Sequence, residues 1–258
     1  MSSILLEIKS NVAVITLNRP DKFNSFNREM ALALQKVLNE CGADENVRCI
    51  LISGAGKAFC AGQDIAELTG DNPLGIEVIL REHFNPIITL IRSLKKPVIA
   101  AVNGVAAGAG ANIAFCCDVV LAASSASFIQ AFTKIGLIPD SGGTYFLPRL
   151  IGFQKASALM MTGDKVSAAD AEKMGMVYKV IDDATFMEAC FAQAQTLAEM
   201  PTQAMAFTKT ALNNSFANTV KQQLEEEDVL QRKAASTFDY KEGINSFIEK
   251  RKPIFTGK

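Results

Sequence analysis

The segment PVIAAVNGVAAGAGANIAFCCDVVLAA, residues 97–123, has an apolar run at each end and a glycine-rich turn between them. Its residues 98–117 carry no charge over 20 positions, a length that can cross a membrane. The composition argues against a membrane helix, because the run consists of Ala, Gly and Val rather than Leu and Phe and is broken by an Asn-Gly pair. We therefore expect two buried strands, over residues 97–102 and 119–123, and no membrane segment.

Predicted strands and helices alternate on the N-terminal side of this segment. Apolar periodicity, an asparagine N-cap and turn residues mark their limits. In chain order they are a hairpin of residues 4–8 and 12–17, a helix after Asn27 carrying the stripe Met30, Leu34, Val37, Leu38 and Cys41, a strand of residues 49–53, and a helix of residues 75–94 kinked at Pro86. This alternation is typical of an α/β fold with parallel crossovers.

The C-terminal part has a different pattern. Ser167 and Asp170 predict the start of a helix that ends at Gly175, and from about Thr185 onward no run resembles a strand. Two further helical stripes follow, separated by Pro201. We therefore expect a core of residues 1–195 followed by a helical region of residues 196–258.

Composition excludes several classes of protein. The chain has 258 residues, 49% of them hydrophobic, which is too apolar for a disordered protein. With 26 basic and 27 acidic residues and no Trp, nucleic acid is not an expected partner. Six cysteines without paired spacing and a single histidine predict no metal site and suggest reduced, mostly buried thiols. The N-terminus lacks a signal-peptide pattern, so a cytoplasmic location is expected.

Two glycine-rich turns are candidates for backbone chemistry. One is residues 61–64, after the strand at Cys49, and the other is residues 108–110, after the strand at Pro97. Glycine permits turns that aim backbone amides at one point, and two such turns together would make an oxyanion hole. Taken alone, however, the glycines favour close packing of helix against strand, since neither turn matches a phosphate-binding motif.

Carboxylates are scarce in the middle of the chain. Between His83 and Thr162 the only ones are Asp118 and Asp140. Asp118 borders a predicted strand and is interpreted as a structural ion-pair residue. Asp140 lies in the apolar sequence GLIPDSGGT, where a raised pKa would suit a general acid or base, although an aspartate that caps the following turn fits equally well. His83, beside Glu82 in a predicted helix, is interpreted as a surface or packing residue.

Several motifs, in order along nearly the whole chain, resemble the crotonase (enoyl-CoA hydratase/isomerase) superfamily. They are Asn18-Arg19-Pro20 with Asn24, Lys57-Ala58-Phe59-Cys60-Ala61-Gly62-Gln63-Asp64, Pro97-Val98-Ile99-Ala100-Ala101-Val102-Asn103-Gly104 and Gly142-Gly143-Thr144. The resemblance implies a spiral of ββα units followed by a C-terminal helical trimerisation region. It also implies an acyl-CoA thioester as substrate, no separate cofactor, and assembly as a homotrimer or a dimer of trimers.

Residue roles follow from the same resemblance. It implies that the backbone amides of Gln63 and Ala109 form the oxyanion hole. It implies CoA contacts by Lys22, Phe23, Ala61, Gln63, Asp64, Ile65 and Ala66, and contacts by Phe247 and Lys250 with CoA bound to a neighbouring subunit.

The chain departs from true hydratases of this superfamily at their two glutamates, because Asn112 and Phe132 stand there. Adding water needs both acids, so hydration is not expected. Asp140 occupies a place where some relatives keep a catalytic aspartate, and the chain resembles the isomerases of phenylacetate catabolism. We therefore expect a ring-1,2-epoxyphenylacetyl-CoA isomerase that forms an oxepin-CoA and also shifts enoyl-CoA double bonds, with Asp140 as the catalytic base. The alternatives are an enoyl-CoA hydratase/isomerase of fatty-acid β-oxidation and a non-catalytic acyl-CoA or RNA-binding relative.

Overall fold

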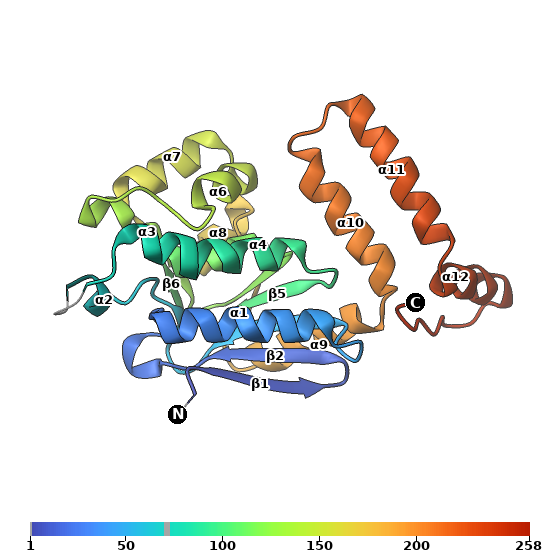
Figure 1. Ribbon diagram of the computed structural model, residues 1–258. Coiled ribbons are helices and arrows are strands. Elements are labelled where there is room, and N and C mark those ends of the chain that lie inside the picture. The colour runs from blue at the N-terminus through green and yellow to red at the C-terminus, as the bar shows by residue number, and fades with distance from the viewer. Residues whose placement is uncertain (1, 70–72) are drawn as a thin grey trace.

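Two β-sheets form the centre of the computed structural model, which describes residues 2–69 and 73–258 (Figure 1). The larger sheet has the order β1-β2-β3-β5-β7-β10 and the smaller one β4-β6-β8-β9. The strands are β1 (Ile4–Lys9), β2 (Val12–Leu17), β3 (Cys49–Gly54), β4 (Ala58–Cys60), β5 (Val98–Val102), β6 (Val105–Ala107), β7 (Val119–Ala123), β8 (Ser127–Ile129), β9 (Lys165–Ser167) and β10 (Lys179–Ile181).

The chain passes from the larger sheet to the smaller one repeatedly. β3, β5 and β7 are parallel neighbours in the larger sheet, and β4, β6 and β8, which follow them directly, are parallel neighbours in the smaller sheet. Each coil of the chain therefore adds one strand to each sheet. The expected α/β spiral of ββα units is confirmed.

The first two strands pair antiparallel, as expected. Their turn is formed by Ser10 and Asn11, both with positive φ (49° and 61°), the geometry that matches the twist of a two-residue hairpin. β3 and β5 are buried along their lengths, which explains their continuous apolar sequences, because parallel strands are covered on both faces.

Helices cover the sheets and extend beyond them at the C-terminal end (Figure 1). They are α1 (Arg28–Ala43), α2 (Ala66–Thr69), α3 (Ile76–Val78), α4 (Asn85–Ser93), α5 (Ala109–Cys116), α6 (Gly143–Ile151), α7 (Phe153–Thr162), α8 (Ala168–Met174), α9 (Phe186–Glu199), α10 (Thr202–Ser215), α11 (Val220–Ala235) and α12 (Phe238–Glu249), with short turns η1 (Pro20–Lys22) and η3 (Ala131–Ile135) and the π-helical η2 (Ile79–Phe84). The Asn27 cap of α1 and the Ser167 cap of α8 are both confirmed, each side chain accepting from a backbone amide.

The predicted helix of residues 75–94 is divided into α3, the π-helical η2 and α4. The cause is Pro86, which has no amide hydrogen to donate to the carbonyl of Glu82 four residues earlier. Gln35 of α1 replaces that donor, because its Nε2 lies 2.6 Å from the Glu82 carbonyl and 3.1 Å from that of His83. The irregular segment is thus held by α1.

Residues 97–123 form β5, β6, α5 and β7. Within residues 2–69 and 73–258, no helix is both long and apolar enough to span a bilayer. All six cysteines are buried free thiols, most of them packed in the core between sheets and helices.

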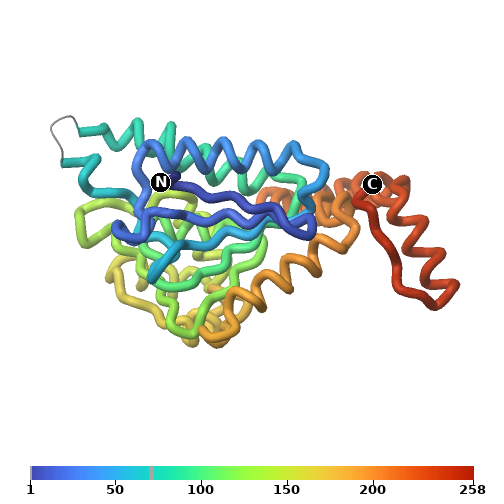
Figure 2. Tube along the Cα trace, turned by 90° about the horizontal axis from the view of Figure 1, so that it is seen from below, coloured from blue at the N-terminus to red at the C-terminus, as the bar shows by residue number. Residues whose placement is uncertain are grey.

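The C-terminal helices project away from the sheets (Figure 1, Figure 2). α9 packs on β2, β3, β5 and β7, so it belongs with the core, and the chain leaves the core at Met200 and Pro201. The boundary expected after residue 195 lies within α9. α11 has no buried residue, and its Val220 and Leu224 are exposed.

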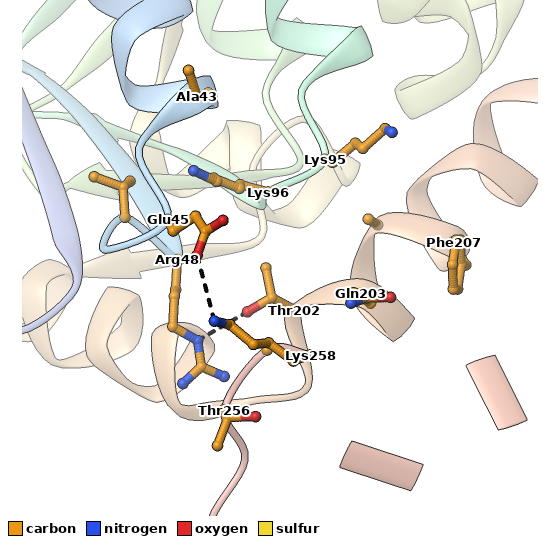
Figure 3. A pocket seen from close by; sticks show the side chains of 14 residues that line it. Ala43, Glu45, Arg48, Lys95, Lys96, Thr202, Gln203, Phe207, Thr256 and Lys258 are labelled. Atoms are coloured by element: carbon orange, nitrogen blue, oxygen red, sulfur yellow. Dashed lines mark hydrogen bonds and ion pairs between the residues drawn. The ribbon is translucent and has the colours of Figure 1, made fainter. Parts of the chain in front are cut away.

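The C-terminal tail returns to the core beside α10. Arg48, before β3, donates to the Thr202 hydroxyl (3.0 Å) and to the carbonyls of Met200 (2.7 Å) and Phe255 (2.9 Å). Lys258 pairs with Glu45 at 3.4 Å. Four of these residues border a cavity of about 640 Å³ whose lining also includes Lys95 and Lys96 (Figure 3). They are Glu45, Arg48, Thr202 and Lys258.

Candidate functional site

Two neighbouring strands of the smaller sheet end at the same edge. β4 and β6 are parallel, with Cys60 paired to Ala106, so the turns that follow them lie side by side. The first turn contains Gly62 and Gln63, and the second contains Gly108 and Ala109, the first residue of α5. The fold therefore brings together the two glycine turns that the sequence singled out.

The turns approach each other very closely. A Cβ atom on Gly62 would lie 3.0 Å from the Ala107 carbonyl oxygen and 3.4 Å from the Ala109 amide nitrogen. Gly62 and Gly108 also have positive φ values of 94° and 52°, and residues with a Cβ rarely adopt such angles. Glycine is therefore needed at both places for the amides to converge.

The amides of Gln63 and Ala109 are available to a ligand. Ala109 begins α5, so its amide has no partner within the helix, and in the described part of the chain neither amide donates to a protein acceptor. The flanking amides are used, since Asp64 donates to the Phe26 carbonyl at 2.8 Å. Two free amides from adjacent turns, one at a helix N-terminus, can stabilise a negatively charged oxygen.

The loop before α1 is bound to the first of these turns. Ala61 donates to the Phe23 carbonyl at 2.9 Å, and Phe26 donates to the Gly62 carbonyl at 2.7 Å. Phe23 is 52% exposed and Ile65 is also 52% exposed, so both present apolar surface beside the oxyanion donors. These hydrogen bonds place the two segments expected to contact CoA, residues 22–23 and 61–66, side by side at the surface.

Asp64 is held within this surface. Its carboxylate accepts from Arg19 at 2.8 Å and from the Ala66 amide at 3.1 Å. Burial raises the pKa of Asp64, but the hydrogen bonds from Arg19 and Ala66 and the charge of Arg19 outweigh it, so the pKa lies below its ordinary value. The ion pair of Asp64 with Arg19 thus fixes the loop, a role for Arg19 that the sequence did not reveal.

Asp140 lies in the turn before α6. Its carbonyl accepts from Gly143, and Ser141 Oγ donates to its Oδ1, both at 2.8 Å. Burial raises the pKa of Asp140, while the bond from Ser141 and that of its own backbone lower it by less. The capping alternative is wrong, because the N-cap of α6 is Gly142 and, among the described residues, the Asp140 carboxylate accepts from Ser141 Oγ and from no amide of the following turn or of α6. Asp140 shapes the turn through its backbone carbonyl and keeps its carboxyl partly buried.

The two places where hydratases carry glutamates hold no acid here. Asn112, on α5, is completely buried and donates to the Asp140 carbonyl at 2.8 Å. Phe132 is buried against the second glycine turn, 3.7 Å from where a Cβ of Gly108 would lie. Asp140 is therefore the acid in the turn that packs beside α5, and its carbonyl is bound by Asn112, which lies one helical turn after Ala109.

Two buried side chains near the first turn have unpartnered polar atoms. His83, in η2, is completely buried, and among the described residues neither ring nitrogen has a partner. Burial lowers the pKa of His83 and outweighs the carboxylates of Glu67 and Glu82, which raise it. Gln63 donates through Nε2 to Glu67 at 2.8 Å, while its Oε1 is buried and unpartnered. The packing interpretation of His83 is confirmed and the surface one is wrong.

Phe247 and Lys250 lie far from the other expected CoA contacts. Both are exposed at the end of α12, Phe247 to 84%, whereas α2 lies at the opposite end of the molecule in both views (Figure 1, Figure 2). One chain therefore does not bring these residues to its own oxyanion donors.

Asp118 has a structural role, as expected. Its carboxylate accepts from Lys209 of α10 at 2.7 Å, from Arg92 of α4 at 3.1 Å and from the Val98 amide at 2.8 Å. It joins the C-terminal helices to the core.

Comparison with known proteins agrees with this geometry. Residues 7–258 match the family described as Enoyl-CoA hydratase/isomerase. A 1,2-epoxyphenylacetyl-CoA isomerase of Escherichia coli (strain K12) is 44% identical over 263 aligned positions, covering 100% of both chains. A probable enoyl-CoA hydratase of Rhodobacter capsulatus is 41% identical, covering 99% of this chain and 98% of the relative.

Solved structures give the same result. The crystal structure of a putative enoyl-CoA hydratase/isomerase from Mycobacterium abscessus superposes with a TM-score of 0.93 at 35% identity, covering 99% of this chain and 100% of the other.

Proposed function

The chain belongs to the enoyl-CoA hydratase/isomerase family of enzymes, and from this premise we propose that it is an acyl-CoA isomerase whose substrate is a ring-1,2-epoxyphenylacetyl-CoA. The product is then an oxepin-CoA, and the same site also shifts enoyl-CoA double bonds. The relative that is 44% identical over the whole chain, named a 1,2-epoxyphenylacetyl-CoA isomerase, supports this substrate.

The observation that carries the isomerase proposal is the supply of acids around the oxyanion donors. Hydration needs one carboxylate to activate water and another to protonate the α-carbon. Asn112 and Phe132 stand at the two hydratase positions, and Asp140, whose carbonyl accepts from Asn112 at 2.8 Å, has a raised pKa. An isomerisation can proceed with one base that removes a proton and returns it elsewhere.

The proposed double-bond shift needs the two amides and Asp140, which acts first as a base and then as an acid. The amides of Gln63 and Ala109 hold the thioester oxygen, and each such donor stabilises the transition state by about 3 kcal/mol. The Asp140 carboxylate takes a proton from the carbon next to the thioester, and the electrons of that bond move onto the thioester oxygen. The electrons then return from the oxygen to form the new double bond next to the thioester, and those of the old double bond take the proton back from Asp140 two carbons further along, so no water enters the product.

Replacing Asp140 tests this role. We expect Asp140→Asn to lose roughly 10²–10⁴-fold in kcat, because the amide cannot accept the proton. It should still bind acyl-CoA, measured by calorimetry with a substrate analogue, since the oxyanion amides remain. The matched control is Asp228→Asn, on exposed α11, which should keep the wild-type rate. A near wild-type rate for Asp140→Asn would disprove the role of Asp140.

A second candidate function is the enoyl-CoA hydratase/isomerase reaction of β-oxidation. The probable enoyl-CoA hydratase that is 41% identical favours it. Assays of 2-enoyl-CoA, 3-enoyl-CoA and epoxyphenylacetyl-CoA side by side separate the candidates. Hydration of 2-enoyl-CoA as the fastest reaction would favour the second one.

The assembly we propose is a homotrimer or a dimer of trimers. Two features support it: the exposed apolar residues on α11 and α12, and the distance of Phe247 and Lys250 from the donors of their own chain. In such an assembly these two residues contact CoA bound to a neighbour. Sedimentation equilibrium measures the mass directly. A cytoplasmic location and the absence of a separate cofactor stay predictions from the sequence.

A further inference from the structure

Asn112 connects the two halves of the proposed active site. It lies three residues after Ala109 on α5, and its side chain donates to the Asp140 carbonyl at 2.8 Å. It is completely buried, so it is in no position to touch a substrate. Its effect on the reaction therefore has to pass through the residues that it binds.

The direction of the hydrogen bonds around Asn112 is determined by chemistry. The Asp140 carbonyl only accepts, so the Asn112 amide nitrogen must face it, and Oδ1 must then face the other way. Gln130 Nε2 donates to that Oδ1 at 2.9 Å. Gln130 is itself buried, just before η3. A chain of two amides thus runs from Gln130 through Asn112 to the backbone of Asp140.

The turn leaves no spare room for Asn112. A Cβ on Gly143 would lie 2.4 Å from Asn112 Nδ2, which is closer than any real contact. Gly143 also donates to the same Asp140 carbonyl, at 2.8 Å. The Asn112 amide is thus fixed on one side by Gln130 and packed on the other against the first residue of α6.

We propose that Asn112 is a positioning residue, which holds the backbone of Asp140 at a defined distance from the Ala109 amide, with Gln130 orienting it. α5 then carries the oxyanion donor on its first residue and the support for the base one turn later. This inference rests on the proposed function, because it gives Asp140 the role of the base.

The first test is Asn112→Ala, which removes the donor from the Asp140 carbonyl. We expect kcat to fall about 10–100-fold, because small misplacements of a reacting group cost up to about 10²-fold. KM should change less than about threefold, since the expected CoA contacts lie on other segments. The acid limb of the kcat–pH profile should move to lower pH, because a looser turn admits water and reduces the burial that raises the pKa of Asp140.

Gln130→Ala distinguishes positioning from a general loss of packing. If Gln130 acts only through Asn112, its removal lowers kcat in the wild type and changes it little when Asn112→Ala is already present. If both residues only support packing, the losses of kcat in Gln130→Ala and Asn112→Ala should multiply in the double variant, and the acid limb of the kcat–pH profile should not move. That result would overturn the inference.

Gly143→Ala tests the same role without replacing Asn112 or Gln130. Its added methyl group should displace the Asn112 side chain. We expect it to shift the acid limb in the same direction as Asn112→Ala, so the inference stays testable if one variant folds poorly. The matched control is Asn213→Ala. The Asn213 side chain also donates to a backbone carbonyl, that of Arg92 at 3.1 Å, but it lies outside the proposed active site. This variant should keep the wild-type kcat and pH profile.

The inference and the proposed function can fail separately. If Asp140→Asn is inactive while Asn112→Ala and Gly143→Ala keep the wild-type kcat and acid limb, the positioning role is wrong and the base is retained. If Asp140→Asn is itself active, the proposed function is wrong.

Discussion

Asp140 is placed where its charge has a stability cost. Its pKa is raised mainly by burial, so the folded protein favours the protonated carboxyl more than the unfolded chain does. The carboxyl therefore contributes stability below its ordinary pKa, and that contribution is lost as the pH rises through the raised pKa. Above the raised pKa the folded protein holds the charged form that a base needs, at the expense of stability.

This predicts a gain of stability in an inactive variant. At pH 8 Asp140→Asn should unfold at a higher temperature than the wild type, by about 2–4 °C for each kcal/mol gained. The amide keeps an oxygen that can accept from Ser141 but carries no charge. Differential scanning calorimetry from pH 8 to pH 4 should show the difference shrinking as the wild-type carboxyl becomes protonated.

Asp228→Asn is the control for this experiment, because its carboxylate lies in an exposed ion pair with Arg232 and should show no such gain. A lower unfolding temperature for Asp140→Asn at pH 8 would contradict the prediction.

At the residue scale, the sequence singled out Asp140 as the candidate base but did not show which residues hold it in place. Asp140 stood out because so few acids surround it in the chain. Its carbonyl is bound by Asn112, 28 residues away, and Asn112 is bound in turn by Gln130. No local pattern encodes a contact between three separate segments of the chain. Asn112 was noticed only as a departure from the hydratases.

At the element scale, the position of α5 is tightly constrained. Its first turn packs directly on the end of β4, and a Cβ on Gly110 would lie 2.4 Å from the Cys60 carbonyl oxygen. Backbone cannot move aside as a side chain can. The position of the Ala109 amide is thus set by the contact between one helix and one strand.

Gly110→Ala should therefore push α5 away from β4. We expect kcat to fall about 10²-fold or more, as when one oxyanion donor is lost. Over-packing should also lower the stability by about 1–3 kcal/mol, measured by urea denaturation.

Gly75→Ala is the matched control, since that glycine has open space around it and a φ of −65°. It should leave both properties unchanged. Wild-type kcat in Gly110→Ala would show that the contact does not set the oxyanion site.

Local sequence patterns were enough to predict several of the elements. The hairpin, the caps of α1 and α8, and the buried strands follow from local rules, and all are confirmed. Pro86 predicted a kink, but the π-helical form of η2 depends on Gln35 from another helix, which the local sequence does not contain.

At the scale of the whole molecule, the tail connects the core to the C-terminal helices. Asp239 of α12 is buried, and its carboxylate accepts from the amides of Thr256 at 2.7 Å and Gly257 at 2.8 Å. Arg48 of the core holds the Phe255 carbonyl next to them. One short segment thus joins the two regions that sequence patterns separate.

Asp239→Asn should loosen this connection. An amide has one oxygen to accept with, so one tail amide loses its partner, at a cost of about 1–3 kcal/mol. We expect faster proteolysis of the tail and a lower denaturation midpoint.

The exposed Asp228→Asn again serves as the control and should behave as the wild type. Equal proteolysis of both variants would mean that Asp239 does not hold the tail.

The six buried cysteines have a practical consequence for labelling. Burial raises the pKa of the Cys41 thiol to about 11 and those of Cys49, Cys60 and Cys190 to about 12. Thiolates, which are the reactive form, are therefore scarce at neutral pH, and the sulfurs are enclosed as well. A cysteine introduced on the outer face of α11 or α12 would be the most reactive thiol, so spectroscopic probes can be attached there without first removing the native ones.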